Sequence, residues 1–99
     1  MTMTYDVETA DEFDSWLDGL VDNAAKEAIA TRILRVQSGL LGDHASVGNK
    51  ISELRIHFGP GYRVYYTVRG KLLVILLAGG TKRTQKKDIK KASDLAAGL

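Results

Sequence analysis

The strongest constraint on the fold comes from two segments, residues 51–58 and 62–68, in which apolar and polar side chains alternate. Alternation with a period of two is typical of β-strands that are buried on one face. Gly59-Pro60-Gly61 separates the two segments and favours a short connection between them. We therefore predict a β-hairpin with a three-residue loop, in which Phe58 pairs with Tyr62, Ile56 with Val64 and Leu54 with Tyr66.

The predicted register brings polar and cationic side chains together on the other face of the hairpin. Arg55 should lie opposite Tyr65, and His57 opposite Arg63. An apolar strand over residues 72–77 follows, and its far end should deliver Lys82 beside Arg63. Three cations would then converge without a nearby acid, although Arg55 could instead pair with Glu53 or with the acidic first helix.

Such a cluster indicates a binding site for an anion. Like charges set side by side destabilise a sheet, and an anionic ligand would relieve that cost. Guanidinium groups present a planar fork that suits phosphate. We therefore prefer the interpretation as a phosphate site to that of a solvated basic surface.

The N-terminal half has the pattern of a short strand followed by two helices. We expect the strand over residues 4–7 and a first helix that begins with a capping box at Thr9 and Glu12. The apolar stripe of this helix consists of Phe13, Trp16, Leu17 and Leu20. A second helix should begin at Asp22 or Asn23 and end at Gly39, with a loop over residues 39–48.

A final helix should follow Thr84, which we expect to cap it, with Ile89, Ala92 and Ala96 facing inward. The predicted order of elements is thus β-α-α-β-β-β-α within a single domain over residues 1–99. We assign it to the α+β class, an antiparallel sheet with helices on one face. The other face should be free for function.

Charge is divided unevenly along the chain. Residues 1–48 contain 3 basic and 9 acidic side chains, whereas residues 49–99 contain 11 basic and 3 acidic ones. This asymmetry favours an anionic partner such as nucleic acid for the basic part. A lysine-rich solvated helix is the alternative for the C-terminal residues alone.

Several classes of site and location are disfavoured by the composition. The chain has no cysteine and two histidines without ligand spacing, so we expect no disulfide, metal or cofactor. The longest apolar run, residues 72–78, is too short to span a bilayer. The acidic N-terminus does not resemble a signal peptide, and we expect a cytoplasmic protein with no membrane partner.

If the anion is RNA, the cluster suits metal-free cleavage, in which the ribose 2′-hydroxyl attacks the adjacent phosphate. Arg55, Arg63 and Lys82 would stabilise the negative charge of the transition state. His57, Tyr65 or a lysine of lowered pKa could accept the proton, and the sequence leaves this choice open. Tyr65 could equally be a packed core residue. We assign substrate binding to Lys50, Gln85 and Lys86.

Three motifs, taken in this order, resemble the addiction-module killer proteins of the RelE/HigB group. They are Glu53-Leu54-Arg55-Ile56, then Gly59-Pro60-Gly61-Tyr62-Arg63-Val64-Tyr65, and Gly79-Gly80 followed by Lys82 and Gln85. The similarity extends over nearly the whole chain. Thr81 is a departure, because many relatives carry an acidic residue there.

The resemblance implies a RelE-like fold and a toxin that cleaves translating mRNA in the ribosomal A site. It also implies a cognate helix-turn-helix antitoxin, through which the complex would contact operator DNA. By this resemblance, the residues expected to be functional are Arg55, Arg63, Tyr65, Lys82 and Gln85. Two alternatives remain, a ParE-like inhibitor of DNA gyrase and an inactive antitoxin-binding module. The cation cluster argues against the gyrase alternative, since a protein interface does not need three cations aimed at one spot.

Overall fold

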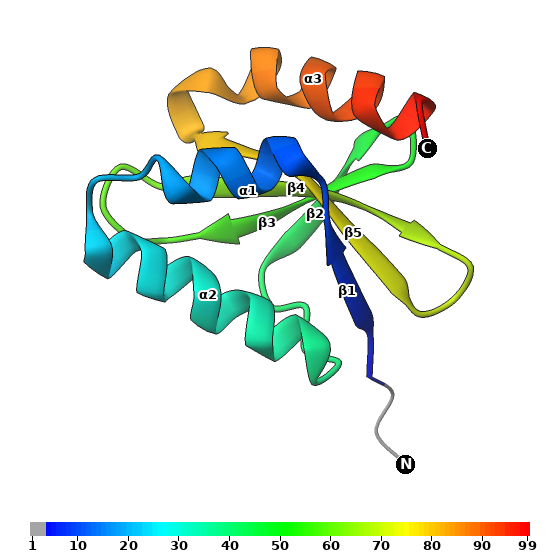
Figure 1. The fold of residues 1–99 in the computed structure, drawn as a ribbon, viewed down its shortest axis with the longest axis horizontal. Helices are drawn as coiled ribbons and strands as arrows, with labels where there is room; N and C mark the ends of the chain where they lie inside the picture. Colours follow the sequence, from blue (N-terminus) through cyan, green and yellow to red (C-terminus); the bar gives the residue numbers. More distant parts are fainter. Residues whose placement is uncertain (1–3) are drawn as a thin grey trace.

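The computed structural model describes residues 4–99, which form a five-stranded sheet and three α-helices (Figure 1). The elements in chain order are β1 (Asp6–Thr9), α1 (Asp11–Asp18), α2 (Asn23–Gln37), β2 (His44–Gly48), β3 (Ile51–Ile56), β4 (Tyr62–Arg69), β5 (Leu73–Thr81), a 3-10 turn (Lys82–Thr84) and α3 (Gln85–Ala97). The predicted α+β class is confirmed. None of the helices within residues 4–99 could span a bilayer.

The strands are arranged in the order β1-β5-β4-β3-β2. All neighbours are antiparallel except β1, which runs parallel to β5 and pairs Asp6 with Leu73. The prediction of an entirely antiparallel sheet was therefore wrong for β1. A tight turn forces adjacent strands to be antiparallel, but the long path between β1 and β5 imposes no such direction.

The predicted loop over residues 39–48 was wrong in its second half, because His44–Gly48 forms the edge strand β2. Its residues alternate between exposed and half-buried and contain no large apolar side chain except Val47. Backbone pairing with β3, through a two-residue turn at Asn49 and Lys50, holds the strand in place. A strand of this composition gives little hydrophobic signal in the sequence.

The observed ends and caps of several elements also differ from the predicted ones. The first strand spans Asp6–Thr9 instead of residues 4–7, because pairing with Leu73–Leu76 fixes its position. The capping box at Thr9 does not form: Ala10 precedes α1, and the Thr9 hydroxyl donates to the Asp14 carboxylate. Thr84 precedes α3 as predicted, but its hydroxyl donates to the buried Asp88 instead of capping the backbone.

Helices cover both faces of the sheet, so the prediction of one free face was wrong. In Figure 1, α3 lies on the opposite side of the sheet from α2. The core on the side of α1 and α2 includes Phe13, Ile29, Val36, Leu54, Val64, Tyr66 and Leu76. The core beneath α3 includes Ile51, Tyr65, Leu77 and Ala92, with Ile89 and Ala96 packed against it as predicted. The face that was predicted to be free is therefore partly covered by α3.

The register of the central hairpin differs from the prediction by two residues. Ile56 pairs with Tyr62, and Arg55 pairs directly with Arg63, whereas Glu53 pairs with Tyr65. The connection takes up residues 57–61, because hydrogen bonds from Phe58 to Ile56 and from Gly61 to Phe58 form consecutive turns there. Gly59 and Gly61 adopt the left-handed φ values that these turns require. His57 consequently leaves the strand, but a shift of two preserves which side chains share a face.

Candidate active site

The candidate site is organised around the carboxylate of Glu53 on β3, which is only 2% exposed. Arg55 Nε donates to Glu53 Oε2 over 2.7 Å, and Arg63 Nε lies 3.4 Å from the same oxygen. Gln85, the first residue of α3, donates to Glu53 Oε1 over 3.3 Å. One buried acid therefore fixes groups from two strands and a helix.

The prediction that the cations converge without a nearby acid was wrong. Side chains two residues apart on a strand share a face, so Glu53 lies beside Arg55, and the shifted register brings Arg63 opposite Arg55. The alternative pairing of Arg55 with Glu53 is the one that forms. The hydrogen bond from Arg55 to Glu53 raises the pKa of the Arg55 guanidinium.

Asp43, which immediately precedes β2, provides a second acid at the rim of the site. His57 Nε2 lies 2.6 Å from Asp43 Oδ2, and Arg55 Nη1 lies 3.6 Å from Asp43 Oδ1. The hydrogen bond with His57 lowers the pKa of Asp43. Sequence reasoning missed Asp43, because a lone acid in a segment without periodicity carries no signal of its partners.

Lys82 reaches the site from the end of β5, as predicted. Its backbone N–H donates to Gly61 O over 2.9 Å, which ties the 3-10 turn to the hairpin loop. Residues 57–61, together with Arg63 and Lys82, line a hollow of about 360 Å³. No carboxylate within residues 4–99 forms an ion pair with the Lys82 ammonium group.

Tyr65 is completely buried beneath α3, and its hydroxyl has no hydrogen-bond partner within the described residues. Burial, together with the nearby Glu53 carboxylate, raises the pKa of Tyr65 to about 12. The Arg63 side chain is nearly as enclosed, and its Nε has no partner with hydrogen-bond geometry. Two buried polar groups, the Tyr65 hydroxyl and Arg63 Nε, thus retain unused hydrogen-bonding capacity.

The N-terminus of α3 approaches the sheet closely because the residue of β5 that faces it is a glycine, Gly80. A Cβ atom on Gly80 would lie 1.8 Å from Asp88 Oδ2, so a side chain at this position would push α3 away. Asp88 accepts the hydrogen bond from Thr84, and Gln85 is thereby held within reach of Glu53. Gly80 is therefore required for the geometry of the site.

The structure brings Arg55, Arg63, Tyr65, Lys82 and Gln85 together, with His57 at the rim. Lys86 is exposed on the first turn of α3. Lys50 lies at the opposite end of the sheet, in the turn between β2 and β3, and is not part of this cluster. Among residues 4–99, no three of the His, Asp and Glu side chains are placed to hold a metal ion.

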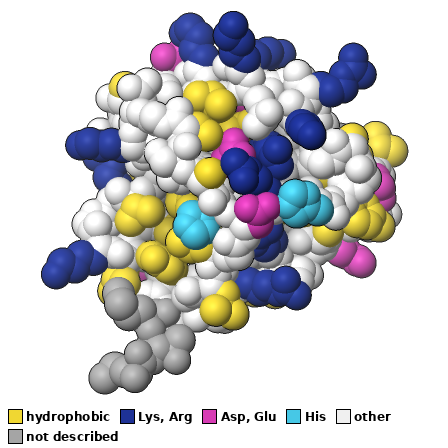
Figure 2. Space-filling view, turned by 180° about the vertical axis from the view of Figure 1, so that it is seen from behind, with side chains coloured by type: hydrophobic (Ala, Val, Ile, Leu, Met, Phe, Trp, Pro, Cys, Tyr) yellow, Lys and Arg dark blue, Asp and Glu magenta, His cyan; other side chains and the backbone are white. Residues whose placement is uncertain are grey.

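Part of the cluster is open to solvent. The Arg55 side chain is 38% exposed, and the His57 side chain is 72% exposed. Figure 2 shows basic side chains gathered around acidic ones near the middle of this face, with the two histidines beside them. This arrangement can receive a phosphate group, because the Arg63 guanidinium and the Lys82 ammonium line one hollow and Glu53 orients Arg63 and the neighbouring Arg55.

Comparisons with known proteins place the chain among related sequences. The family model described as "Phage derived protein Gp49-like" matches residues 15–97. A protein of Haemophilus influenzae (strain Rd), described as uncharacterized, is 52% identical over 97 residues, which cover 98% of each chain.

A solved structure of E. coli toxin RelE, a mutant in the free state, has a similar fold. Its TM-score is 0.68 at 16% sequence identity, and the match covers 90% of this chain and 98% of the RelE chain. The predicted RelE-like fold is confirmed by this similarity.

Proposed function

This chain belongs to the Phage derived protein Gp49-like family, a family of RelE-like toxins, and we propose that it is a ribosome-dependent mRNA endoribonuclease. As the toxin of a toxin-antitoxin pair, it would block translation in the cytoplasm. A cognate helix-turn-helix antitoxin would neutralise it and provide the contacts with operator DNA.

The observation that carries this proposal is the pairing of Arg55 and Arg63 with the Glu53 carboxylate, beside a hollow that Arg63 and Lys82 line. Cleavage of RNA by its own 2′-hydroxyl places additional negative charge on the phosphate in the transition state. Donors that are already oriented stabilise that charge without reorganising during the reaction. Glu53 supplies this orientation for the two arginines, while Lys82 remains without a carboxylate partner among the described residues.

Proton transfer is the second requirement of the reaction. A bond forms between the 2′-oxygen and phosphorus, the bond from phosphorus to the 5′-oxygen breaks, and a 2′,3′-cyclic phosphate results. We assign acceptance of the 2′-hydroxyl proton to His57, which borders the hollow and is oriented by Asp43 at 2.6 Å. Lys82, whose ammonium group borders the same hollow, can donate a proton to the leaving 5′-oxygen, whereas the Tyr65 hydroxyl is completely buried and does not line the hollow.

The isolated protein does not enclose its substrate, because the hollow at Arg63 and Lys82 is open to solvent and Arg55 is partly exposed. Positioning of the scissile phosphate must then come from another surface. The ribosome can supply it by holding the mRNA in one geometry, which is itself a large part of the rate acceleration. The need for a second surface to position the scissile phosphate supports dependence of the cleavage on the ribosome.

The test is primer extension on a defined mRNA in a purified translation system, with and without ribosomes. We expect cuts that need ribosomes and are lost with Lys82→Ala and His57→Ala. Both side chains border the hollow and neither belongs to a core cluster, so these variants should fold normally. Arg35→Ala is the matched control, because Arg35 is an exposed cation on α2.

Intact mRNA in the presence of folded wild-type protein would overturn the proposal. If such protein still arrested growth, a supercoiling assay with DNA gyrase would examine the ParE-like alternative. Absence of growth arrest, with retained binding of the antitoxin, would identify an inactive binding module.

A further inference from the structure

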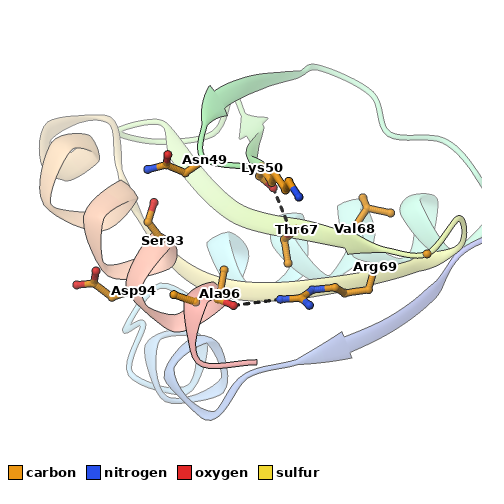
Figure 3. A pocket seen from close by; sticks show the side chains of 10 residues that line it. Asn49, Lys50, Thr67, Val68, Arg69, Ser93, Asp94 and Ala96 are labelled. Carbon is orange, nitrogen blue, oxygen red and sulfur yellow. Dashed lines mark hydrogen bonds between the residues drawn. The ribbon is translucent and has the colours of Figure 1, made fainter.

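A second, larger hollow lies at the other end of α3 from Gln85. It has a volume of about 650 Å³ and is bounded by the turn between β2 and β3, the end of β4 and the last turns of α3. Figure 3 shows Asn49 and Lys50 on one side, Ser93 and Asp94 on the helix, and Arg69 reaching toward Ala96. None of these residues takes part in the candidate active site.

The electrostatic character of this hollow is cationic. Neither Lys50 nor Arg69 forms an ion pair with a carboxylate of residues 4–99. Asp94, the acid in the wall, is paired with Lys90 over 3.0 Å. Arg69 uses one nitrogen to donate to Ala96 O over 3.1 Å, and its guanidinium has further donors available.

Lys50 occupies a position that lysine rarely takes. Asn49 and Lys50 form a two-residue turn with φ values of 52° and 63°, and such turns favour Asn followed by Gly. A lysine with positive φ is strained, and the hydrogen bond from Thr67 Oγ1 to Lys50 O, at 2.9 Å, holds it there. Backbone strain of this kind is concentrated at functional sites.

The two basic sites lie on the same face of the sheet. Arg63, Tyr65, Thr67 and Arg69 alternate along β4 on the side covered by α3. Six residues of strand separate Arg63 from Arg69, a distance of about 20 Å. A single strand of RNA that runs along α3 could therefore contact both sites.

We propose that the hollow at Lys50 and Arg69 binds a backbone phosphate of RNA at a distance from the cleavage site. The inference rests on the proposed function, because it assigns a second contact to the same class of substrate. The phosphate belongs either to the mRNA being cut or to ribosomal RNA beside it, and the chemistry of recognition is the same in both cases.

The test uses Lys50→Gly, which removes the cation and relieves the backbone strain at once. We expect a higher melting temperature than that of the wild type, together with weaker RNA binding. A loss of about fivefold in affinity, and a decrease of about 0.7 in the slope of log affinity against log salt concentration, is expected for one phosphate contact. Lys50→Arg should retain affinity, and Arg35→Ala is again the control.

Two probes distinguish the source of the phosphate. A short single-stranded RNA whose 2′-hydroxyl at the scissile position is replaced by hydrogen represents mRNA, and vacant ribosomes represent ribosomal RNA. Weaker binding of Lys50→Gly to either probe supports the site and identifies its partner. Unchanged binding of Lys50→Gly to both probes would overturn the proposed phosphate site, even if the wild type cleaves mRNA. The converse result is a wild type that does not cleave mRNA while Lys50→Gly binds RNA more weakly. This result would contradict the proposed endoribonuclease activity and support the proposed phosphate site.

Discussion

Arg55 and Arg63 lie directly opposite each other on β3 and β4, although both side chains are cationic. The pairing is tolerated because Glu53, two residues before Arg55, places one carboxylate oxygen 2.7 Å from Arg55 Nε and 3.4 Å from Arg63 Nε. Glu53 thus compensates for a repulsion that would otherwise destabilise the sheet. The same contact fixes the two guanidinium groups that we propose as the phosphate site.

Glu53→Gln should lower the free energy of unfolding by about 2 kcal/mol, because it leaves two facing arginines without a compensating charge. Chemical denaturation measures this difference. Glu27→Gln is the control, since Glu27 is exposed on α2 and should change stability by less than about 0.5 kcal/mol. Equal stability of Glu53→Gln and wild type would show that the carboxylate does not hold the arginine pair.

Tyr65→Phe should leave stability unchanged or raise it by up to about 1 kcal/mol, since the buried hydroxyl that it removes has no hydrogen-bond partner. Because this hydroxyl is completely buried and does not line the hollow, the same variant should cleave mRNA at close to the wild-type rate. Denaturation and primer extension on the same preparation test both statements. A clear loss of stability would instead indicate that the hydroxyl is bonded in solution.

The pKa of Tyr65 predicts a further effect at alkaline pH. Its value in the folded protein, about 12, lies above the ordinary value of 10.0, so the neutral phenol stabilises the folded state. That contribution is complete below pH 10 and is lost as the pH rises toward 12. Wild-type stability should therefore fall more steeply over this interval than that of Tyr65→Phe. Parallel curves would contradict the burial of an ionisable group at this position.

Gly79→Ala should destabilise the contact between α1 and β5. A Cβ atom at Gly79 would lie 2.3 Å from the ring of Trp16, so the helix or the indole must move. We expect a loss of about 1–3 kcal/mol and a change in fluorescence, since Trp16 is the sole tryptophan. Gly98→Ala, near the end of α3 where space is available, should change neither property. An unaltered emission spectrum of Gly79→Ala would be inconsistent with this packing.

Asp43 should contribute to stability in a pH-dependent way. The hydrogen bond with His57 lowers its pKa below the ordinary value of 3.8, so the charged carboxylate favours the folded state. This contribution is present above pH 3.8 and disappears as the pH falls through the lower folded value. Asp43→Asn should thus be less stable than wild type at pH 6 and approach it in acid. A difference in stability between Asp43→Asn and the wild type that stays constant over this pH range would contradict the pH-dependent contribution of Asp43.

The parts of the fold that could be predicted from the sequence have strong periodic signals. Phe13, Trp16 and Leu17 mark the buried side of α1, and the alternation of residues 51–56 and 62–68 marks the central hairpin. The register was wrong because the sequence does not show how many residues a loop consumes. Since the error was an even number, Arg55 and Arg63 were still assigned to one face.

The missed features depend on long-range contacts. Asp43 acquires its role because β2 pairs with β3, and a short polar edge strand has no distinctive pattern. The position of α3 over the second face depends on Gly80, which admits Asp88, and the position of α1 depends on Gly79, which admits Trp16 from the opposite side of β5. Neither contact could be derived from local propensity.

The parallel pairing of β1 with β5 has a consequence for folding during translation. β1 is made first, yet its hydrogen-bonding partner, residues 73–76, lies more than sixty positions later in the chain. Ordering such a distant pair is slow and must wait until β5 has emerged from the ribosome that synthesises it. Gln85, which completes the arginine cluster, emerges later still. We therefore expect a nascent chain to be harmless to its own ribosome until translation is almost complete.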